Sequence, residues 1–195
     1  MKKYQIIYAD PPWPIKWQNS NTVSGFKCLQ YPTMPISDMC NLPIKSISDD
    51  GCKCFIWTTN YFLPEGLGLL KAWGFQYDKL WTWCKPTGAG GHPRNSTEHI
   101  IEGTRGFIKT IGTLGVSATN NWFLSPKGKH SVKPEIARKM IERFYPNSNK
   151  IELFARQKTE GWDVWGNEVE SDIDLNNAKQ YDKRHTHEQG EIYGR

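Results

Sequence analysis

The sequence has no long apolar run, and this absence argues against a helix that crosses a membrane. No stretch approaches the roughly 18 apolar residues that a membrane-spanning helix needs. The apolar run near the N-terminus covers only Ile6 to Ala9, which is too short for the hydrophobic region of a secretory signal. We therefore expect a cytoplasmic protein without a membrane partner.

Paired cysteine motifs and common nucleotide or hydrolase motifs are also missing. The five cysteines are odd in number and lack the paired spacing of a zinc finger, so we expect reduced thiols. Cys52 and Cys54 would face the same side of a strand, but two thiols without a second pair do not form a metal site. No Gly-x-Ser-x-Gly turn and no phosphate-binding loop spacing occur. We expect no bound metal.

Apolar residues are few, at 37%, yet the chain carries 9 Trp, 8 Tyr and 8 Phe. Large aromatic side chains each bury a large area, so a substantial core is still available. The formal net charge of +5 is compatible with a polyanionic partner and equally with an ordinary solvated surface. Composition therefore predicts a globular protein and gives only weak support for a nucleic-acid partner.

The length suits one domain, which we place at residues 1–170. Residues 171–195 contain few bulky aliphatic side chains and show no clear period. They predict a polar C-terminal tail that is weakly ordered, or a short helix docked through Ile173, Leu175 and Tyr181.

Strand and helix patterns alternate along residues 1–170, which predicts an α/β fold with a mostly parallel sheet and helices on both faces. The residues 134–145 place Ile136, Ile141 and Phe144 on one face of a helix, and residues 62–73 form a second helical pattern that contains two glycines. The apolar runs that predict buried strands are Tyr4–Ala9, Cys52–Thr58, Leu80–Cys84, His99–Gly103 and Ile151–Phe154.

The first predicted strand runs directly into Asp10-Pro11-Pro12-Trp13. Neither proline has an N–H to continue a ladder, so the chain must leave the sheet at Asp10. This places a carboxylate, a stiff backbone and an indole at the carboxyl end of a strand, where α/β sheets bind ligands. The carboxylate and a freed carbonyl can accept from an exocyclic amino group while the indole stacks on a flipped base. The alternative is a polar loop with a half-buried Trp.

With this motif the chain resembles the DPPW-bearing adenine-N6 methyltransferases, a family that uses S-adenosylmethionine. The family includes the catalytic subunit of the messenger-RNA adenosine methyltransferase and short bacterial and phage relatives. The resemblance covers roughly residues 4–169 and implies a Rossmann-like methyltransferase fold. The matching segments are residues 7–13, Tyr31-Pro32-Thr33-Met34, residues 55–58, residues 81–85, Glu98-His99, residues 131–134, residues 140–143, residues 150–156 and residues 161–167.

The resemblance implies roles for individual residues. Asp10 and the Pro11 carbonyl would accept from the adenine 6-amino group, Trp13 would stack on the base or form a wall beside it, and Pro12 belongs to the same catalytic motif. Lys133, an unusual residue before a helix-starting Pro, would pair with the carboxylate of the cofactor. The remaining residues expected to border the cofactor are Asp10, Glu152, Phe154, Arg156, Asn167 and Glu168.

The chain departs from the family in two places near the cofactor. Asn167-Glu168 stands where the family has Asn-Gln, and Glu can still accept from both ribose hydroxyls. Gln157-Lys158 stands where the messenger-RNA enzyme has Pro-His-Asn, which weakens the transfer of ribose contacts at that point.

On the substrate side, Tyr31 matches a family aromatic near the target base. The segment Pro86–Ser96 is rich in glycine and is expected to be a mobile loop whose Arg94 contacts a phosphate, or else a plain surface loop. Lys16 and Lys85 are weaker candidates of the same kind, as are Arg105, Lys127 and Lys129.

The resulting hypothesis is an S-adenosylmethionine-dependent adenine-N6 methyltransferase that acts on nucleic acid, with DNA favoured over RNA. Two alternatives stay open: a non-catalytic subunit that only binds nucleic acid, and an enzyme acting on a free nucleotide or small amine. The small body offers little surface for reading a long site, so we expect a homodimer or a partner subunit in target recognition.

Overall fold

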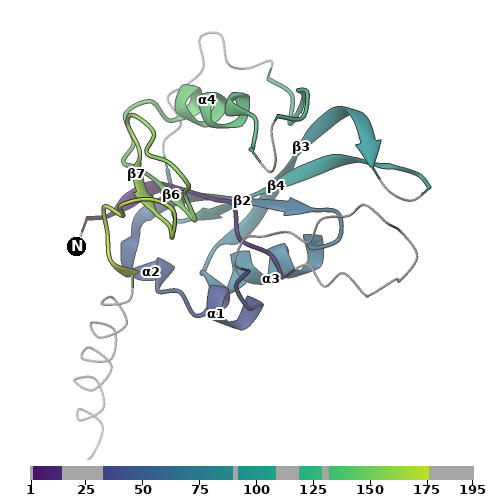
Figure 1. Ribbon diagram of the computed structural model, residues 1–195. Coiled ribbons are helices and arrows are strands. Elements are labelled where there is room, and N and C mark those ends of the chain that lie inside the picture. Colours follow the sequence, from purple (N-terminus) through teal and green to yellow (C-terminus); the bar gives the residue numbers. More distant parts are fainter. Residues whose placement is uncertain (1, 15–32, 90–91, 109–118, 129–131, 176–195) are drawn as a thin grey trace, which may run out of the picture.

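The computed structural model describes residues 2–14, 33–89, 92–108, 119–128 and 132–175. Within these ranges the chain alternates short helices with the strands of one sheet (Figure 1). The strands are β1 (Tyr4–Ala9), β2 (Ser48–Thr59), β3 (Gln76–Ala89), β4 (Asn95–Arg105), β5 (Trp122–Leu124), β6 (Lys150–Leu153) and β7 (Asp163–Trp165). The helices are α1 (Ile36–Cys40), α2 (Ile44–Ile47), α3 (Leu63–Ala72) and α4 (Glu135–Phe144).

The sheet has the order β5-β3-β4-β2-β1-β6-β7 and is mostly parallel. The strand β1 pairs in parallel with β2 and β6, and the pairs β3–β5 and β6–β7 are also parallel. Only β4, among the described strands, runs antiparallel to its neighbours β2 and β3. The predicted α/β class and Rossmann-like arrangement are therefore confirmed.

Apolar layers cover both faces of the sheet. In β1, Ile7 belongs to the layer that contains Leu69 of α3, whereas Ile6 belongs to the layer that contains Ile141 of α4. Neighbouring residues of a strand point to opposite faces, so a continuous apolar run serves both layers. Figure 1 shows α1, α2 and α3 on one side of the sheet and α4 on the other.

The helix predicted at residues 134–145 is α4, Glu135–Phe144, and the one predicted at residues 62–73 is α3, Leu63–Ala72. Pro134 directly precedes the first turn of α4, and Glu135 places a carboxylate near the positive end of that helix. Ile141 is buried as the amphipathic pattern predicted, but Ile136 is 41% exposed, and the other buried residue of the helix is Ala137. No helix among the described residues is long and apolar enough to span a membrane.

The predicted loop at Pro86–Ser96 was wrong at both of its ends. The strand β3 continues through Ala89, and β4 begins at Asn95, which lies opposite Ala89. The ladder is irregular between Cys84 and Ala89, which is where a proline without an N–H can be accommodated. Backbone pairing across an antiparallel hairpin thus overrides the turn signal of the glycines and prolines.

Residues 171–175 pack on the body although the predicted domain ended at residue 170. Leu175 is only 1% exposed and lies in the same apolar layer as Ile7. The Asp172 carboxylate accepts a hydrogen bond from the backbone N–H of Val164 at 2.9 Å. The division at residue 170 stays a prediction, and the proposed contact of Tyr181 lies outside the described residues.

Candidate active site

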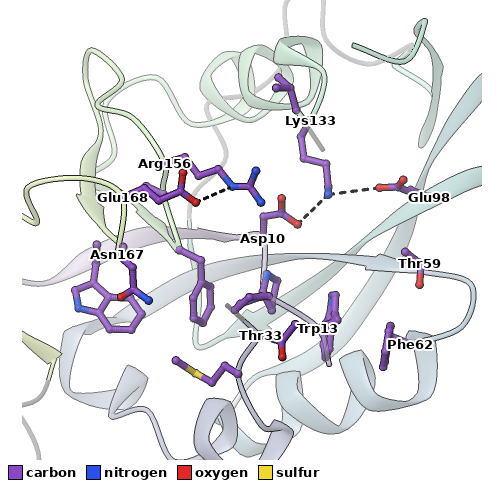
Figure 2. Close-up of a pocket in the computed structure, with 18 of the residues that line it drawn as sticks. Asp10, Trp13, Thr33, Thr59, Phe62, Glu98, Lys133, Arg156, Asn167 and Glu168 are labelled. Atoms are coloured by element: carbon purple, nitrogen blue, oxygen red, sulfur yellow. Dashed lines mark ion pairs between the residues drawn. The ribbon is translucent and has the colours of Figure 1, made fainter. Parts of the chain in front are cut away.

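The candidate site is a cavity of about 340 Å³ at one edge of the sheet (Figure 2). The parallel strands β1, β2 and β6 end at this edge, and the antiparallel β4 begins there. The chain just before α4 reaches the same edge with Lys133. The lining residues used below are Asp10, Pro11, Pro12, Trp13, Thr33, Thr59, Phe62, Glu98, Lys133, Phe154, Arg156, Trp165, Gly166, Asn167 and Glu168.

The Asp10-Pro11-Pro12-Trp13 segment forms a fixed turn at the end of β1. The backbone N–H of Trp13 donates to the Pro11 carbonyl at 2.9 Å, and the N–H of Met34 donates to the Pro12 carbonyl at 3.0 Å. A carbonyl oxygen has two lone pairs, so Pro11 keeps one acceptor site for a ligand. The prolines and these hydrogen bonds hold Asp10 at the cavity with little freedom.

Trp13 forms a wall of the cavity and is itself largely buried, at 6% exposure. Its Nε1 donates to the Trp57 carbonyl at 3.1 Å, and its ring stacks on Phe62 with centroids 5.3 Å apart. One face of the indole is therefore already occupied by Phe62, so a ligand ring meets only the remaining surface of Trp13.

Four charged side chains form a row of alternating sign beside this turn. The Lys133 ammonium lies 2.9 Å from Asp10 Oδ1 and 3.5 Å from Glu98 Oε2. The Lys85 ammonium lies 2.5 Å from Glu98 Oε1. Burial lowers the pKa of Lys133, but Asp10 and Glu98 outweigh this effect and hold the pKa above its ordinary value. Lys133 is thus a cation at neutral pH.

A second group of residues borders the other end of the cavity. Phe154 follows β6 and packs edge-on against Trp165, with ring centroids 5.4 Å apart. Arg156 Nε lies 3.6 Å from Glu168 Oε1, and Asn167 lines the same end of the cavity (Figure 2). Gly166 is required at its position because an added Cβ would lie 2.1 Å from the Ala155 carbonyl oxygen.

The structure brings most of the predicted site residues to this one cavity. All four residues from Asp10 to Trp13 line it, and the predicted cofactor residues that also line it are Lys133, Phe154, Arg156, Asn167 and Glu168. Their roles stay predictions, because a shared cavity shows their proximity and not what they bind.

Other predicted residues lie elsewhere. Glu152 is not among the described lining residues; its carboxylate pairs with Arg138 at 2.7 Å. Lys85 is not among the described lining residues but contacts Glu98 and Trp83, which are, and Arg94 is exposed on the β3–β4 hairpin. Tyr31 and Lys16 lie outside the described residues.

Glu98, Thr59, Phe62 and Thr33 line the cavity although none was predicted as a site residue. Thr59 has the signal that identified Asp10, a polar residue at the end of an apolar strand. Glu98 had no such signal, because it lies near the start of a strand whose direction is not visible in the local pattern.

The family described as MT-A70 matches residues 4–168 of this chain. Among similar proteins, "Type II methyltransferase M.MunI" from a Mycoplasma species is 34% identical over 86% of this chain and 78% of its own length. "N(6)-adenosine-methyltransferase catalytic subunit METTL3" from Homo sapiens is 29% identical over 86% of this chain. "N(6)-adenosine-methyltransferase MT-A70-like" from Arabidopsis thaliana is 29% identical over 85% of it.

The match covers very different shares of these relatives. It spans 28% of the human protein and 24% of the Arabidopsis protein, against 78% of the Mycoplasma protein. The matched part therefore corresponds to a minor part of the long eukaryotic proteins and to most of the Mycoplasma protein.

Proposed function

Because this chain belongs to the MT-A70 family, we propose that it transfers a methyl group from S-adenosylmethionine to the 6-amino group of adenine in nucleic acid. The observation that carries the proposal is the position of Asp10 and the Pro11 carbonyl. These two acceptors belong to neighbouring residues that both line the cavity, in a turn held by the backbone hydrogen bonds of Trp13 and Met34. An amino group has two N–H donors that such a pair can hold.

The other cavity residues fit the parts of S-adenosylmethionine. The Lys133 ammonium, just ahead of the N-terminus of α4, suits a carboxylate. Asn167 and Glu168 offer amide and carboxylate groups to ribose hydroxyls, and the rings of Phe154 and Trp165 offer apolar surface to a base. This donor set supports a cofactor with a carboxylate at one end and a nucleoside at the other.

When bound, S-adenosylmethionine supplies the electrophile, a methyl group on a sulfonium sulfur. Asp10 and the Pro11 carbonyl accept from the two amino hydrogens of the target and hold the nitrogen in one orientation. These hydrogen bonds keep electron density on the amino nitrogen instead of in the ring. Methyl transfer would form the N–C bond as the S–C bond of the cofactor breaks, and the surplus amino proton would pass along its hydrogen bond to the Asp10 carboxylate. Trp13, Pro12 and Phe62 form the apolar wall beside the reacting atoms and limit the access of water.

A binding role without catalysis is the alternative from another functional class. The intact Asp10 carboxylate, its fixed turn and the Lys133 ammonium argue against it. A domain that only held nucleic acid would have no need for a half-buried ion pair at the end of β1.

We favour DNA as the substrate, with RNA as the alternative. The chain covers 78% of the bacterial type II methyltransferase but only 28% of the human adenosine methyltransferase subunit. The proposal includes action in the cytoplasm. It also includes help from a second copy or a partner subunit in target recognition, because a body of this length offers little surface for reading a long site.

The test is transfer of a labelled methyl group from S-adenosylmethionine to double-stranded DNA, single-stranded DNA and RNA of the same sequences, followed by nucleoside analysis. We expect N6-methyladenine with the wild type, and a loss of at least about a hundredfold with Asp10→Asn, which keeps the shape but removes the charge.

The matched control is Asp50→Asn, because Asp50 is exposed at the amino end of β2, away from the cavity. It should methylate like the wild type. Product formation by Asp10→Asn at the wild-type rate would contradict the catalytic assignment. Intact cofactor binding without transfer to any polymer would instead favour a binding subunit or a missing partner.

A further inference from the structure

Glu98 holds a central place in the row of charges, although the proposed reaction gives it no role. Its two carboxylate oxygens have different partners: Oε1 lies 2.5 Å from Lys85 and Oε2 lies 3.5 Å from Lys133. Lys133 in turn lies 2.9 Å from Asp10. Figure 2 shows the Lys133 ammonium between the carboxylates of Asp10 and Glu98.

The surroundings keep both ammonium groups in place. The Lys133 Nζ lies 5.4 Å from the ring centroid of Trp57, and the Lys85 Nζ lies 4.7 Å from that of Trp83. These two indoles pack edge to face, and each is fixed by a hydrogen bond from its Nε1, to Tyr8 and Ser125 respectively. A cation over an indole face is held by the ring quadrupole. Glu98 therefore joins two cations of restricted position and does not belong to a freely solvated surface pair.

The ion pair between Asp10 and Lys133 weakens Asp10 for its proposed work. In the structure, Oδ1 of Asp10 accepts from the ammonium, and this contact lowers the negative charge with which the carboxylate, through either oxygen, holds the target amino group. An ammonium has three N–H donors, so Lys133 keeps donors for the cofactor carboxylate and for a second carboxylate of the protein when Asp10 shifts toward the target. Among the described residues, the second carboxylate paired with Lys133 is Glu98.

We propose that Glu98 is a positioning residue, which holds the Lys133 ammonium when Asp10 engages the target amino group, and that Lys85 holds Glu98 in turn. This inference rests on the proposed function and deepens it. It assigns Glu98 an action through Lys133, and no direct contact with the base or the cofactor.

The electrostatics of Glu98 agree with this role. Burial raises its pKa, but Lys133 and Lys85 outweigh burial and hold the pKa below the ordinary value, so the carboxyl group is charged at neutral pH. The charged or titratable groups that face it are Lys85 from β3, Lys133 ahead of α4, Asp10 beyond Lys133, and the adjacent His99. His99 is held between Thr82 and Asn60, and burial keeps its pKa below the ordinary value.

The first test is Glu98→Gln, which keeps the size of the side chain and removes its charge. We expect kcat to fall about tenfold, because Lys133 then stays on Asp10, while the Kd for S-adenosylmethionine changes less than about threefold. The Tm should stay close to that of the wild type. The control Glu135→Gln removes the same charge from the exposed pair with Lys139 and should leave kcat unchanged.

A double-mutant cycle with Lys133→Met separates the proposed role from others. If Glu98 acts through Lys133, Glu98→Gln should change the single-turnover rate less than about twofold in the Lys133→Met background. An equal loss in both backgrounds, with a raised KM for nucleic acid, would mean a direct contact and overturn the proposal. A fall in Tm that parallels the fall in rate would mean a structural role and would also overturn it.

A pH profile tests the part played by Lys85. In Lys85→Met the Glu98 carboxyl loses one of the two cations that lower its pKa, so kcat should begin to fall at a higher pH on acidification than in the wild type. Lys85→Arg should restore the wild-type profile. Coincident profiles of all three proteins would contradict the proposal. Absence of methyl transfer by the wild type itself would instead refute the proposed function, which keeps the two failures apart.

Discussion

Phe154 has a backbone φ of 60°, a conformation that L-residues with a side chain rarely adopt. It follows β6 directly, where the chain turns toward Ala155, whose N–H donates to the Trp165 carbonyl at 3.0 Å. The turn brings the ring of Phe154 against Trp165 at the cavity. Because the strain persists at a ligand cavity, the contacts made by the Phe154 ring must stabilise the protein by more than the strained backbone costs.

Substitution of Phe154 separates its strain from its ring. Both Phe154→Ala and Phe154→Gly remove the contact with Trp165, but only Gly relieves the strain at φ 60°. We expect Phe154→Gly to be more stable than Phe154→Ala by about 1 kcal/mol in urea unfolding. Both variants should bind S-adenosylmethionine about tenfold more weakly than the wild type. Equal stability of the two variants would show that the turn carries no strain.

The helix α3 contains Gly66 and Gly68, and these two glycines differ in their surroundings. A Cβ added at Gly66 would lie 2.6 Å from the Ile101 side chain of β4, whereas one added at Gly68 would meet nothing within 4 Å. Gly66 therefore permits close packing of α3 on the sheet, whereas packing does not require a glycine at position 68. A glycine inside a helix is less favourable than alanine.

These glycines give a matched pair of substitutions within one element. Gly68→Ala should raise the free energy of unfolding by about 1 kcal/mol, through helix propensity alone. Gly66→Ala should gain less or lose stability, because the fully buried Ile101 must move to accept the methyl group. Thermal unfolding of both variants measures the difference, and a larger gain for Gly66→Ala would contradict the packing of α3 described above.

A charged cluster links the neighbouring strands β2, β3 and β4 on the face of the sheet that α4 covers. Lys53 of β2 pairs with Asp78 of β3 and lies 2.9 Å from Glu102 of β4, which also accepts from Trp81 Nε1 at 2.7 Å. Burial raises the pKa of Asp78, but the Lys53 ammonium outweighs this effect and holds the pKa below the ordinary value. The cluster thus ties the antiparallel β4 to strands on both of its sides.

The lowered pKa of Asp78 sets the sign of a pH effect on stability. A carboxyl group with a lower pKa in the folded state stabilises the fold above its unfolded pKa, and loses this contribution as the pH falls through its folded value. We expect the wild type to be more stable than Asp78→Asn at pH 7, with a difference that shrinks toward about pH 3. Urea titrations at both pH values test this, with Asp50→Asn as the control. A difference independent of pH would contradict the ion pair.

On the scale of the whole molecule, the parts that could be predicted were those fixed by burial. The run Tyr4–Ala9 is apolar because β1 is buried on both faces, and the predicted bounds equal those of the strand. The outer parts of β3 and β4 are held by backbone pairing and not by burial, so their composition of glycine, proline and polar residues predicted a loop. Strands β5 and β7 have three residues each, too few to show a period.

The candidate site likewise contains some residues that a local pattern could predict and others that it could not. Asp10 and Lys133 could be selected from local anomalies, a strand ended by two prolines and a lysine before a helix-starting proline. Glu98 matched the family segment but received no role, because its place at the cavity depends on β4 running antiparallel to β2. The direction of a strand depends on tertiary pairing, and a local pattern does not contain it.

The C-terminal limit of the folded body is a property of the whole molecule and gives the last prediction. Leu175, at 1% exposure, packs in the layer with Tyr4 and Ile7, far from it in sequence. If residues 171–175 are part of the body, Leu175→Ala should lower the free energy of unfolding by about 3 kcal/mol. Leu67→Ala, at a leucine with 39% exposure on α3, should change it by about 0.5 kcal/mol or less. Equal effects of the two substitutions in urea unfolding would place the end of the domain before Leu175 and favour the weakly ordered tail over the docked one.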